Sequence, residues 1–244
     1  MEIHAIKTAV VQPGASLLDL LDAYLPKLAE QTIVAITSKI VSTCANRIVH
    51  KDAVDQYALI QQEADAYLAE ECGVYDKHLT IKQQRIVPSA GIDESNILDA
   101  YILYPEDSQQ SAEAIWQALR TKHQLTHLGV IITDSIVTPL RTGVSGACIG
   151  WCGFAPLHDY IGTPDIFNQT LRMTKINLLD ALATAAVFVM GEGAEQTPLA
   201  TIHHAPKIHF QTHIPTAEEK QSIYIDPDQD LFAPLVKRKR WIWK

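Results

Sequence analysis

The sequence lacks long hydrophobic runs, paired cysteine motifs and an excess of cationic side chains. No apolar segment approaches the roughly 20 residues that a membrane-spanning helix needs, and Met1–Ala5 does not begin a basic and then apolar leader. We therefore expect a cytoplasmic protein without membrane contact. The cysteines form no Cys-x-x-Cys pair and are expected to be free thiols: Cys44, Cys72, Cys148 and Cys152.

Positive charge is scarce. The chain has 20 Lys and Arg against 28 Asp and Glu, a formal net charge of -8, which repels nucleic acid at long range. A basic tail, Lys237–Arg240, is followed by Trp241 and Trp243. This tail could bind nucleic acid, but we favour a solvated tail, or tryptophans that dock on the core or on a partner subunit. A phosphate ligand would need local cations, for which the candidates are Lys39, Arg47, Arg141, Arg172 and Lys175.

Several common catalytic motifs are also missing. Without His-Glu-x-x-His, a zinc hydrolase of that type is not supported, and without Gly-x-Ser-x-Gly there is no serine nucleophile elbow. The pair Ser38-Lys39 follows an apolar strand and resembles a strand-to-helix phosphate site. It lacks the glycines of a phosphate-binding loop, and a capping serine beside an exposed lysine explains it equally well.

Helical and strand-like periodicities are interleaved along the chain. They predict an α/β fold, in the mixed α+β sense, with mixed sheets and packed helices. We expect strands at 32–37, 101–104, 128–133 and 199–202, a hairpin from 79–81 and 85–87, and helices at 54–69, 111–122 and 176–190. Residues 1–210 form the main unit, and residues 211–244 form a polar extension that ends in the basic, tryptophan-containing tail.

Two acidic segments carry the clearest sign of chemistry. Asp134 follows an apolar stretch, so its carboxylate is expected at the edge of a buried strand, where α/β folds bind ligands. In the segment 88–96, Ala90-Gly91 permits a tight turn, and Asp93 and Asn96 lie three residues apart on an expected first helical turn. Each aspartate alone could be a turn former or a cap. Together, two carboxylates can share a divalent cation.

Further oxygen-bearing side chains stand near these segments. Ser135 and Thr133 flank Asp134 and supply oxygens suited to magnesium or manganese. Glu192 follows an expected helix C-terminus, where a carboxylate is disfavoured by about 0.3 to 1 kcal/mol unless a cation or solvent compensates. The glycine-rich stretch 141–150 indicates either close backbone packing or approach by a ligand.

Taken together, these segments resemble the gamma-glutamyl ligase family that adds glutamate to the deazaflavin cofactor precursor coenzyme F(420)-0. The resemblance runs from about Ile3 to Ile202. It rests on the following motifs: Thr37-Ser38-Lys39-Ile40-Val41-Ser42, Ala90-Gly91-Ile92-Asp93-Glu94-Ser95-Asn96, Ile132-Thr133-Asp134-Ser135, Pro139-Leu140-Arg141-Thr142-Gly143, Leu157-His158-Asp159-Tyr160 and Val189-Met190-Gly191-Glu192.

The resemblance implies an intertwined homodimer whose residues 1–210 are the catalytic unit. It implies a ligase that uses GTP or ATP with Mg or Mn to activate a carboxylate as an acyl phosphate, which L-glutamate then attacks. One metal would be bound by Asp93 and Asp134, with Ser135 and Glu192 near a second. Nucleotide contacts would come from Val10, Val11, Ser38, Lys39, Asn96, Gly191, Gly193 and Thr197. We expect catalytic roles for Lys39, Asp134 and Arg141.

Three departures from the family pattern concern the substrates. Thr43 stands where a second lysine is usual, Ser135 replaces threonine, and Ile161 stands where arginine is frequent. The amino-acid sequence of residues 86–96 is more similar to a branch of the family that is assigned to folate metabolism. Our leading hypothesis is therefore a gamma-glutamyl ligase for a folate-type acceptor. The alternatives are the coenzyme F(420)-0 ligase and a non-catalytic nucleotide-binding regulatory protein, which Thr43 would permit.

Overall fold

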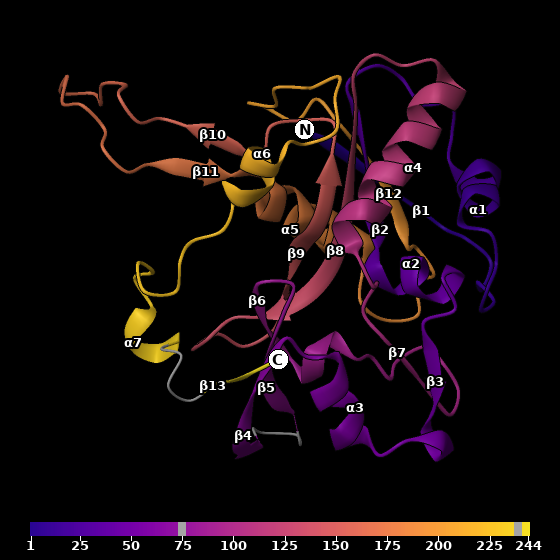
Figure 1. Ribbon diagram of the computed structural model, residues 1–244. Helices are drawn as coiled ribbons and strands as arrows, with labels where there is room; N and C mark the ends of the chain where they lie inside the picture. The colour runs from indigo at the N-terminus through magenta and orange to yellow at the C-terminus, as the bar shows by residue number, and fades with distance from the viewer. Residues whose placement is uncertain (73–76, 237–240) are drawn as a thin grey trace.

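The centre of the computed structural model is a five-stranded mixed sheet (Figure 1). The structure describes residues 1–72, 77–236 and 241–244. The strand order is β1-β12-β2-β8-β9, in which β2 and β8 run parallel and all other neighbours are antiparallel. The strands are β1 (Glu2–Ile6), β2 (Thr32–Thr37), β8 (Leu128–Val137), β9 (Val144–Cys152) and β12 (Leu199–His203).

Helices cover both faces of this sheet, which explains why β2 and the first half of β8 are continuous apolar runs rather than alternating ones. On one face, α1 (Leu17–Tyr24) and α4 (Ser108–His123) pack around Ile36 and Ile132. On the other face, α5 (Leu178–Met190) packs around Ile131. The mixed α/β class and its packed helices are thereby confirmed.

Residues 144–150 of the glycine-rich stretch belong to strand β9, which is buried from Gly146 onward and lies in close backbone contact with two helices. A Cβ at Gly146 would lie 2.3 Å from the Ala183 carbonyl oxygen on α5, and one at Gly150 would lie 2.2 Å from that of Ser108 on α4. Cys148 and Cys152 lie on the same strand, and burial raises the pKa of each thiol to about 12. The thiols of Cys44, Cys148 and Cys152 are free, as predicted, and the side chain of Cys72 lies outside the described part.

A smaller antiparallel sheet, of order β13-β4-β5-β6, lies below the first in Figure 1. A two-stranded sheet, β3–β7, and helix α3 (Gln56–Glu63) accompany it. These strands are β3 (Ile48–His50), β4 (Ala66–Cys72), β5 (His78–Lys82), β6 (Arg85–Pro88), β7 (Ala100–Ile102) and β13 (Trp241–Trp243). Arg85 joins the two sheets, because its guanidinium donates to the Cys148 carbonyl at 2.7 Å and to Asp180 on α5 at 3.0 Å.

The predicted hairpin is confirmed as β5–β6, but the helix expected at 54–69 is wrong in its second half. Helix α3 ends at Glu63, and Ala66–Cys72 forms β4. Apolar spacing in this segment fits both structures, and pairing of β4 with β5 on one side and β13 on the other decides for a strand.

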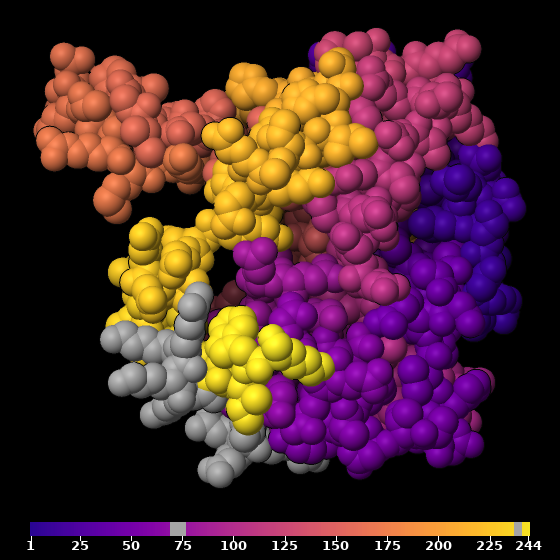
Figure 2. Space-filling model, in the orientation of Figure 1, coloured from indigo at the N-terminus to yellow at the C-terminus, as the bar shows by residue number. Residues whose placement is uncertain are grey.

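Two segments extend beyond this body. Strands β10 (Leu157–Asp159) and β11 (Lys175–Asn177) form an arm that stands clear of it (Figure 2). The C-terminal extension runs through α6 (Ala217–Gln221) and α7 (Ala233–Val236) to β13, where Trp241 packs on Ala66 and Leu68. Docking of a tail tryptophan on the body of the protein was one of the expectations for this tail. Its basic part, residues 237–240, lies outside the described residues. In the described chain no helix combines the length and apolarity of a transmembrane span.

Candidate active site

The parallel strands β2 and β8 bring Ser38 and Asp134 together. Thr37 and Thr133 are paired in register, and the next residue of each strand carries a site side chain. Ser38 begins α2 (Ser38–Cys44), and its Oγ donates to Asp134 Oδ1 at 2.8 Å. Strand β8 continues to Val137 and pairs with β9 up to that residue, so Asp134 lies within β8, just past the part that pairs with β2. The expected position at the end of the strand is therefore wrong, although Asp134 does follow the apolar run of β8.

Asp93 lies in the smaller unit, by which we mean the sheet β13-β4-β5-β6 together with β3–β7 and α3, and its side chain faces Lys39. Its backbone exchanges two hydrogen bonds with Ile102, at 2.9 and 2.8 Å, and its carboxylate accepts from the Ser95 amide at 2.7 Å. The expected helical turn at Asp93–Asn96 is therefore wrong. The bridge to Ile102 holds Asp93 extended, and Asn96 has a φ of 58°, which ends any helical continuation.

Lys39 connects the two acidic segments. Its Nζ lies 2.8 Å from Asp93 Oδ2 and donates to Ser95 Oγ at 2.7 Å. Burial would raise the pKa of Asp93, but hydrogen bonds from Lys39 and Ser95 outweigh it and lower the pKa. The charge of Asp93 also helps to raise the pKa of Asp134, so the two carboxylates lie within electrostatic reach. The structure thus gathers Ser38, Lys39, Asp93 and Asp134.

Asp134 is partly buried beside a tyrosine that the sequence analysis did not identify. Burial raises the pKa of Asp134, although Ser38 and Tyr104 act in the opposite direction. Burial, and after it the charge of Asp134, raises the pKa of Tyr104 well above its ordinary value. The Tyr104 hydroxyl nevertheless makes no hydrogen bond of full geometry with any described residue. Its position as the last residue of the predicted strand 101–104 gave no reason to separate it from other core aromatics.

Ser135 and Glu192 form a second pair. Ser135 Oγ donates to Glu192 Oε1 at 2.5 Å. Because successive residues of a strand point to opposite faces, Ser135 lies on the face covered by α5, whereas Asp134 lies on the face beside α2. Thr133, which was expected to add an oxygen next to Asp134, also points away from it and contacts the Ile36 carbonyl at 3.4 Å.

The backbone segments expected to contact a nucleotide lie beside one another. The loop after β1 holds Val10 and Val11 and is tied by the Thr8 amide to the Gln196 carbonyl at 2.9 Å. The loop after α5 is tied to β2 by the Thr37 amide, which donates to the Pro198 carbonyl at 3.0 Å. Both loops therefore flank Ser38. The residues of the second loop are held internally: the Gly193 amide donates to Glu195, Thr197 donates to the Met190 carbonyl, and Gly191 caps α5.

Two expected site residues are not drawn into this cluster. Asn96 is exposed on its turn, and Arg141 is exposed on the loop between β8 and β9. Within the described chain, neither side chain has a hydrogen bond or an ion pair to the clustered residues. Their assignment to nucleotide binding and catalysis therefore still depends on the sequence resemblance.

The chemistry of the donor set fits a hard divalent cation, because Asp93, Asp134, Ser135 and Glu192 offer only oxygen ligands. The repulsion between Asp93 and Asp134 would also be relieved by a cation between them. The described residues contain no group of three or more His, Cys, Asp or Glu placed to hold a metal. Ligands beyond these two pairs would then come from the phosphate oxygens of a nucleotide or from water.

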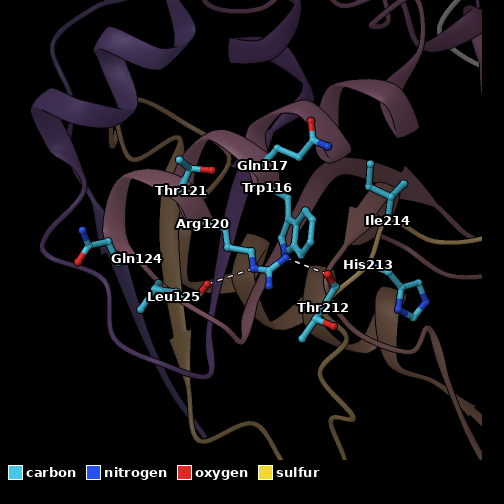
Figure 3. Close-up of a pocket in the computed structure, with 9 residues that line it drawn as sticks. All are labelled: Trp116, Gln117, Arg120, Thr121, Gln124, Leu125, Thr212, His213 and Ile214. Carbon is cyan, nitrogen blue, oxygen red and sulfur yellow. Dashed lines mark hydrogen bonds between the residues drawn. The ribbon is translucent and has the colours of Figure 1, made fainter.

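A groove of about 450 Å³ lies elsewhere, along the C-terminal half of α4 (Figure 3). Arg120 crosses it and donates to the carbonyls of Leu125, at 3.1 Å, and Thr212, at 2.8 Å. None of its nine lining residues belongs to the cluster. We therefore place the candidate active site at the Ser38 and Asp134 end of the sheet and not in this groove.

Comparison with known proteins agrees with the motif pattern. The family described as F420-0:Gamma-glutamyl ligase matches residues 5–204. A coenzyme F420:L-glutamate ligase of Methanopyrus kandleri is 30% identical over 91% of this chain and 93% of its own length. A protein of the same description from Methanosarcina barkeri is 42% identical over 47% of this chain and 45% of its own length. One from Haloarcula marismortui is 35% identical over 60% of this chain and 54% of its own length. The matched part of this chain thus spans about half of each of these two relatives. The chain belongs to the F420-0:gamma-glutamyl ligase family and is an enzyme, a gamma-glutamyl ligase.

Proposed function

We propose that this ligase joins L-glutamate to a carboxylate of a coenzyme F(420)-0 type acceptor, with GTP or ATP and a divalent metal as co-reactants. The names of the relatives favour this acceptor over the folate type that the motif wording indicated. The observation that carries the proposal is the meeting of Ser38 with Asp134 and of Lys39 with Asp93 at one end of two parallel strands. Carboxylates and a lysine at one point suit phosphoryl transfer.

The proposed reaction has two steps. An oxygen of the acceptor carboxylate attacks the terminal phosphorus, the bond to the nucleoside diphosphate breaks, and an acyl phosphate forms. The glutamate amine then attacks the acyl carbon, phosphate leaves with the former carboxylate oxygen, and the amine loses a proton. In the first step Lys39 can exchange Asp93 for phosphate oxygens and hold the charge that develops on them.

The aspartates have a different part in this proposal. Asp93 and Asp134, with Ser135 and Glu192 as a second pair, would hold divalent cations, which supply positive charge to the triphosphate. Ser38 keeps the Asp134 carboxylate in one orientation through its 2.8 Å hydrogen bond. Without local cations, a chain of net charge -8 would repel a nucleotide.

The test is a glutamylation assay with purified protein, L-glutamate, GTP or ATP, and Mg or Mn. Deazaflavin acceptor and folate are supplied in separate reactions, and mass spectrometry detects a gain of one glutamyl unit. Glutamylation of the deazaflavin acceptor is the expected result. Glutamylation of folate alone would overturn the proposed acceptor in favour of the folate type. Nucleotide-dependent thermal stabilisation without phosphate release would indicate the regulatory alternative instead.

A folate-type acceptor remains the second candidate because of two positions. Thr43, in place of a lysine, is 6% exposed on α2, so it offers no cation to a nucleotide or an acceptor. Ile161, in place of an arginine, lies on the β10–β11 arm and is 46% exposed. Both changes remove positive charge, which an acceptor with fewer phosphate groups would need less.

We further propose that the protein is a homodimer in which a second copy covers the arm. Large apolar side chains are exposed there, among them Ile166, Phe167 and Met173. Exposed apolar clusters of this kind mark contact surfaces. Light scattering should give a mass near twice 27.0 kDa for the wild type and a lower mass for Phe167→Asp. Leu98→Asp, at an equally exposed site outside the arm, is the control.

A further inference from the structure

Tyr104 carries a buried polar atom that the fold alone does not explain. Its side chain is 2% exposed and packs among Ile36, Ile132 and other residues of the core beneath α4. Its hydroxyl is one of the few buried side-chain polar atoms of the described chain without a hydrogen-bond partner. A buried phenol normally has a partner, because burying an unpaired hydroxyl is costly.

The ring of Tyr104 is fixed to the segment that carries Asp93. A Cβ on Gly91 would lie 2.3 Å from Cδ2 of this ring, so the ring presses directly on the glycine backbone, whose φ is +72°. Two residues after Gly91, Asp93 is hydrogen-bonded on both sides to Ile102. Ile102 in turn lies two residues before Tyr104. The ring and the Asp93 carboxylate are therefore linked through Gly91 and through Ile102.

The hydroxyl of Tyr104 lies against Asp134, which belongs to the larger sheet. Tyr104 packs in the same cluster as Ile132, and Asp134 is the next residue of β8 on that face of the sheet. In agreement with this placement, the charge of Asp134 contributes to raising the pKa of Tyr104. Ser38 already donates to Oδ1 of Asp134. A carboxylate can accept several hydrogen bonds, and the Tyr104 phenol is an unpaired donor on the same face of the sheet.

We propose that Tyr104 is a positioning residue that sets the placement of Asp134 relative to Asp93. When a divalent cation binds, the phenol donates to the Asp134 carboxylate and holds its plane, while the ring holds the Asp93 segment through Gly91. Tyr104 does not touch the reacting atoms in this role. The inference rests on the proposed metal-dependent function and adds to it the residue that fixes the spacing of the two carboxylates.

The variant Tyr104→Phe tests this role, because it keeps the ring and its contact with Gly91 and removes only the hydroxyl. Binding of Mn²⁺ to the protein without nucleotide is measured by electron paramagnetic resonance titration. Loss of a partner that orients a metal ligand commonly weakens metal affinity, so we expect the dissociation constant to rise about 10-fold. The melting temperature should change little, because the hydroxyl makes no hydrogen bond of full geometry with any described residue.

Tyr101→Phe is the matched control, because Tyr101 is also buried but belongs to the cluster around α3. It should leave Mn²⁺ affinity unchanged. Equal affinity of the wild type and Tyr104→Phe would overturn the positioning role and leave the proposed function standing. A wild type that binds no Mn²⁺ would overturn the proposed metal dependence, and this inference with it.

A double-mutant cycle with Ser38→Ala adds a second criterion. Ser38 and Tyr104 would hold the same carboxylate, so their effects on Mn²⁺ affinity should be coupled and not additive. A cycle between Ser38→Ala and Tyr101→Phe should show additive effects. Additive losses for Ser38 and Tyr104 would show that the two side chains do not share Asp134, and would overturn the role.

Discussion

The Lys39 ammonium lies 2.8 Å from the Asp93 carboxylate, so the side chain that we expect to hold phosphate is paired with the side chain that we expect to hold metal. This ion pair also joins the larger sheet to the smaller unit, because Lys39 is in the first turn of α2 and Asp93 lies on the bridge to β7. Nucleotide and metal would have to separate the two charges, each taking one of them.

Replacing Lys39 by methionine should separate metal binding from nucleotide use. Lys39→Met frees Asp93, so Mn²⁺ affinity without nucleotide should be unchanged or tighter. The kcat/KM for the nucleotide should fall about 100-fold, the scale of losing one group that stabilises transition-state charge. Steady-state kinetics and Mn²⁺ titration measure the two effects. Lys51→Met is the control, because Lys51 is paired with Glu94 instead, and an unchanged kcat/KM in Lys39→Met would remove Lys39 from the site.

Replacing Asp134 by asparagine should abolish turnover without unfolding the protein. Burial raises the pKa of Asp134, so the folded state disfavours the ionised carboxylate. The folded protein therefore loses stability as pH rises from the ordinary pKa of an aspartate through the raised pKa of Asp134. The amide carries no charge, and the melting temperature at neutral pH should stay equal or rise. Retained turnover at saturating metal would contradict this assignment. A clear fall in melting temperature at neutral pH would contradict it as well.

The apolar pattern of the sequence was sufficient to predict the strands and the helix that are buried on both faces. The runs of β2, β8 and α5 are apolar because each is covered by neighbours, and β2 and α5 were predicted close to their bounds, whereas β8 runs to Val137 and not to residue 133. The ends of the apolar runs of β2 and β8 also identified Ser38, Lys39 and Asp134 as candidate site residues. Only the register of β2 on β8, which is a tertiary property, could show that Ser38 donates to Asp134.

Prediction failed where long-range pairing decides the conformation. The segment Ala66–Cys72 has apolar spacing that fits a helix, yet it is a strand because β5 and β13 pair with it. One of these partners lies near the C-terminus, far away in sequence. Tyr104 was missed for a similar reason, since only the meeting of two units places its hydroxyl beside Asp134.

Glu94 should make the smaller unit sensitive to acid. A hydrogen bond from Lys51, and after it one from Lys77, lowers the pKa of Glu94 below its ordinary value of 4.5. A lowered pKa means that the stabilisation is present above that ordinary value and is lost as pH falls through the lower, folded-state pKa. Glu94→Gln should therefore melt at a lower temperature than the wild type at pH 7, and the difference should disappear in acid.

Thermal melting of both proteins from pH 7 to below the ordinary pKa of Glu94 measures this. Glu106→Gln is the control, because Glu106 is exposed and its carboxylate has no ion pair within the described residues. It should follow the wild type at every pH. A difference between Glu94→Gln and the wild type that persists or grows in acid would contradict the assignment to these ion pairs.

Trp241 should stabilise the protein without contributing to the active site. Its side chain is 7% exposed and packs on Ala66 and Leu68, and β13 covers the edge of β4. Trp241→Ala should lose about 3 kcal/mol of unfolding free energy and about 6 to 12 °C of melting temperature. Trp243, on the same strand, is 45% exposed, so Trp243→Ala should lose less. Since the family match ends at residue 204, kcat/KM measured well below the melting temperature should be unchanged in both variants, and equal destabilisation by the two would contradict the burial argument.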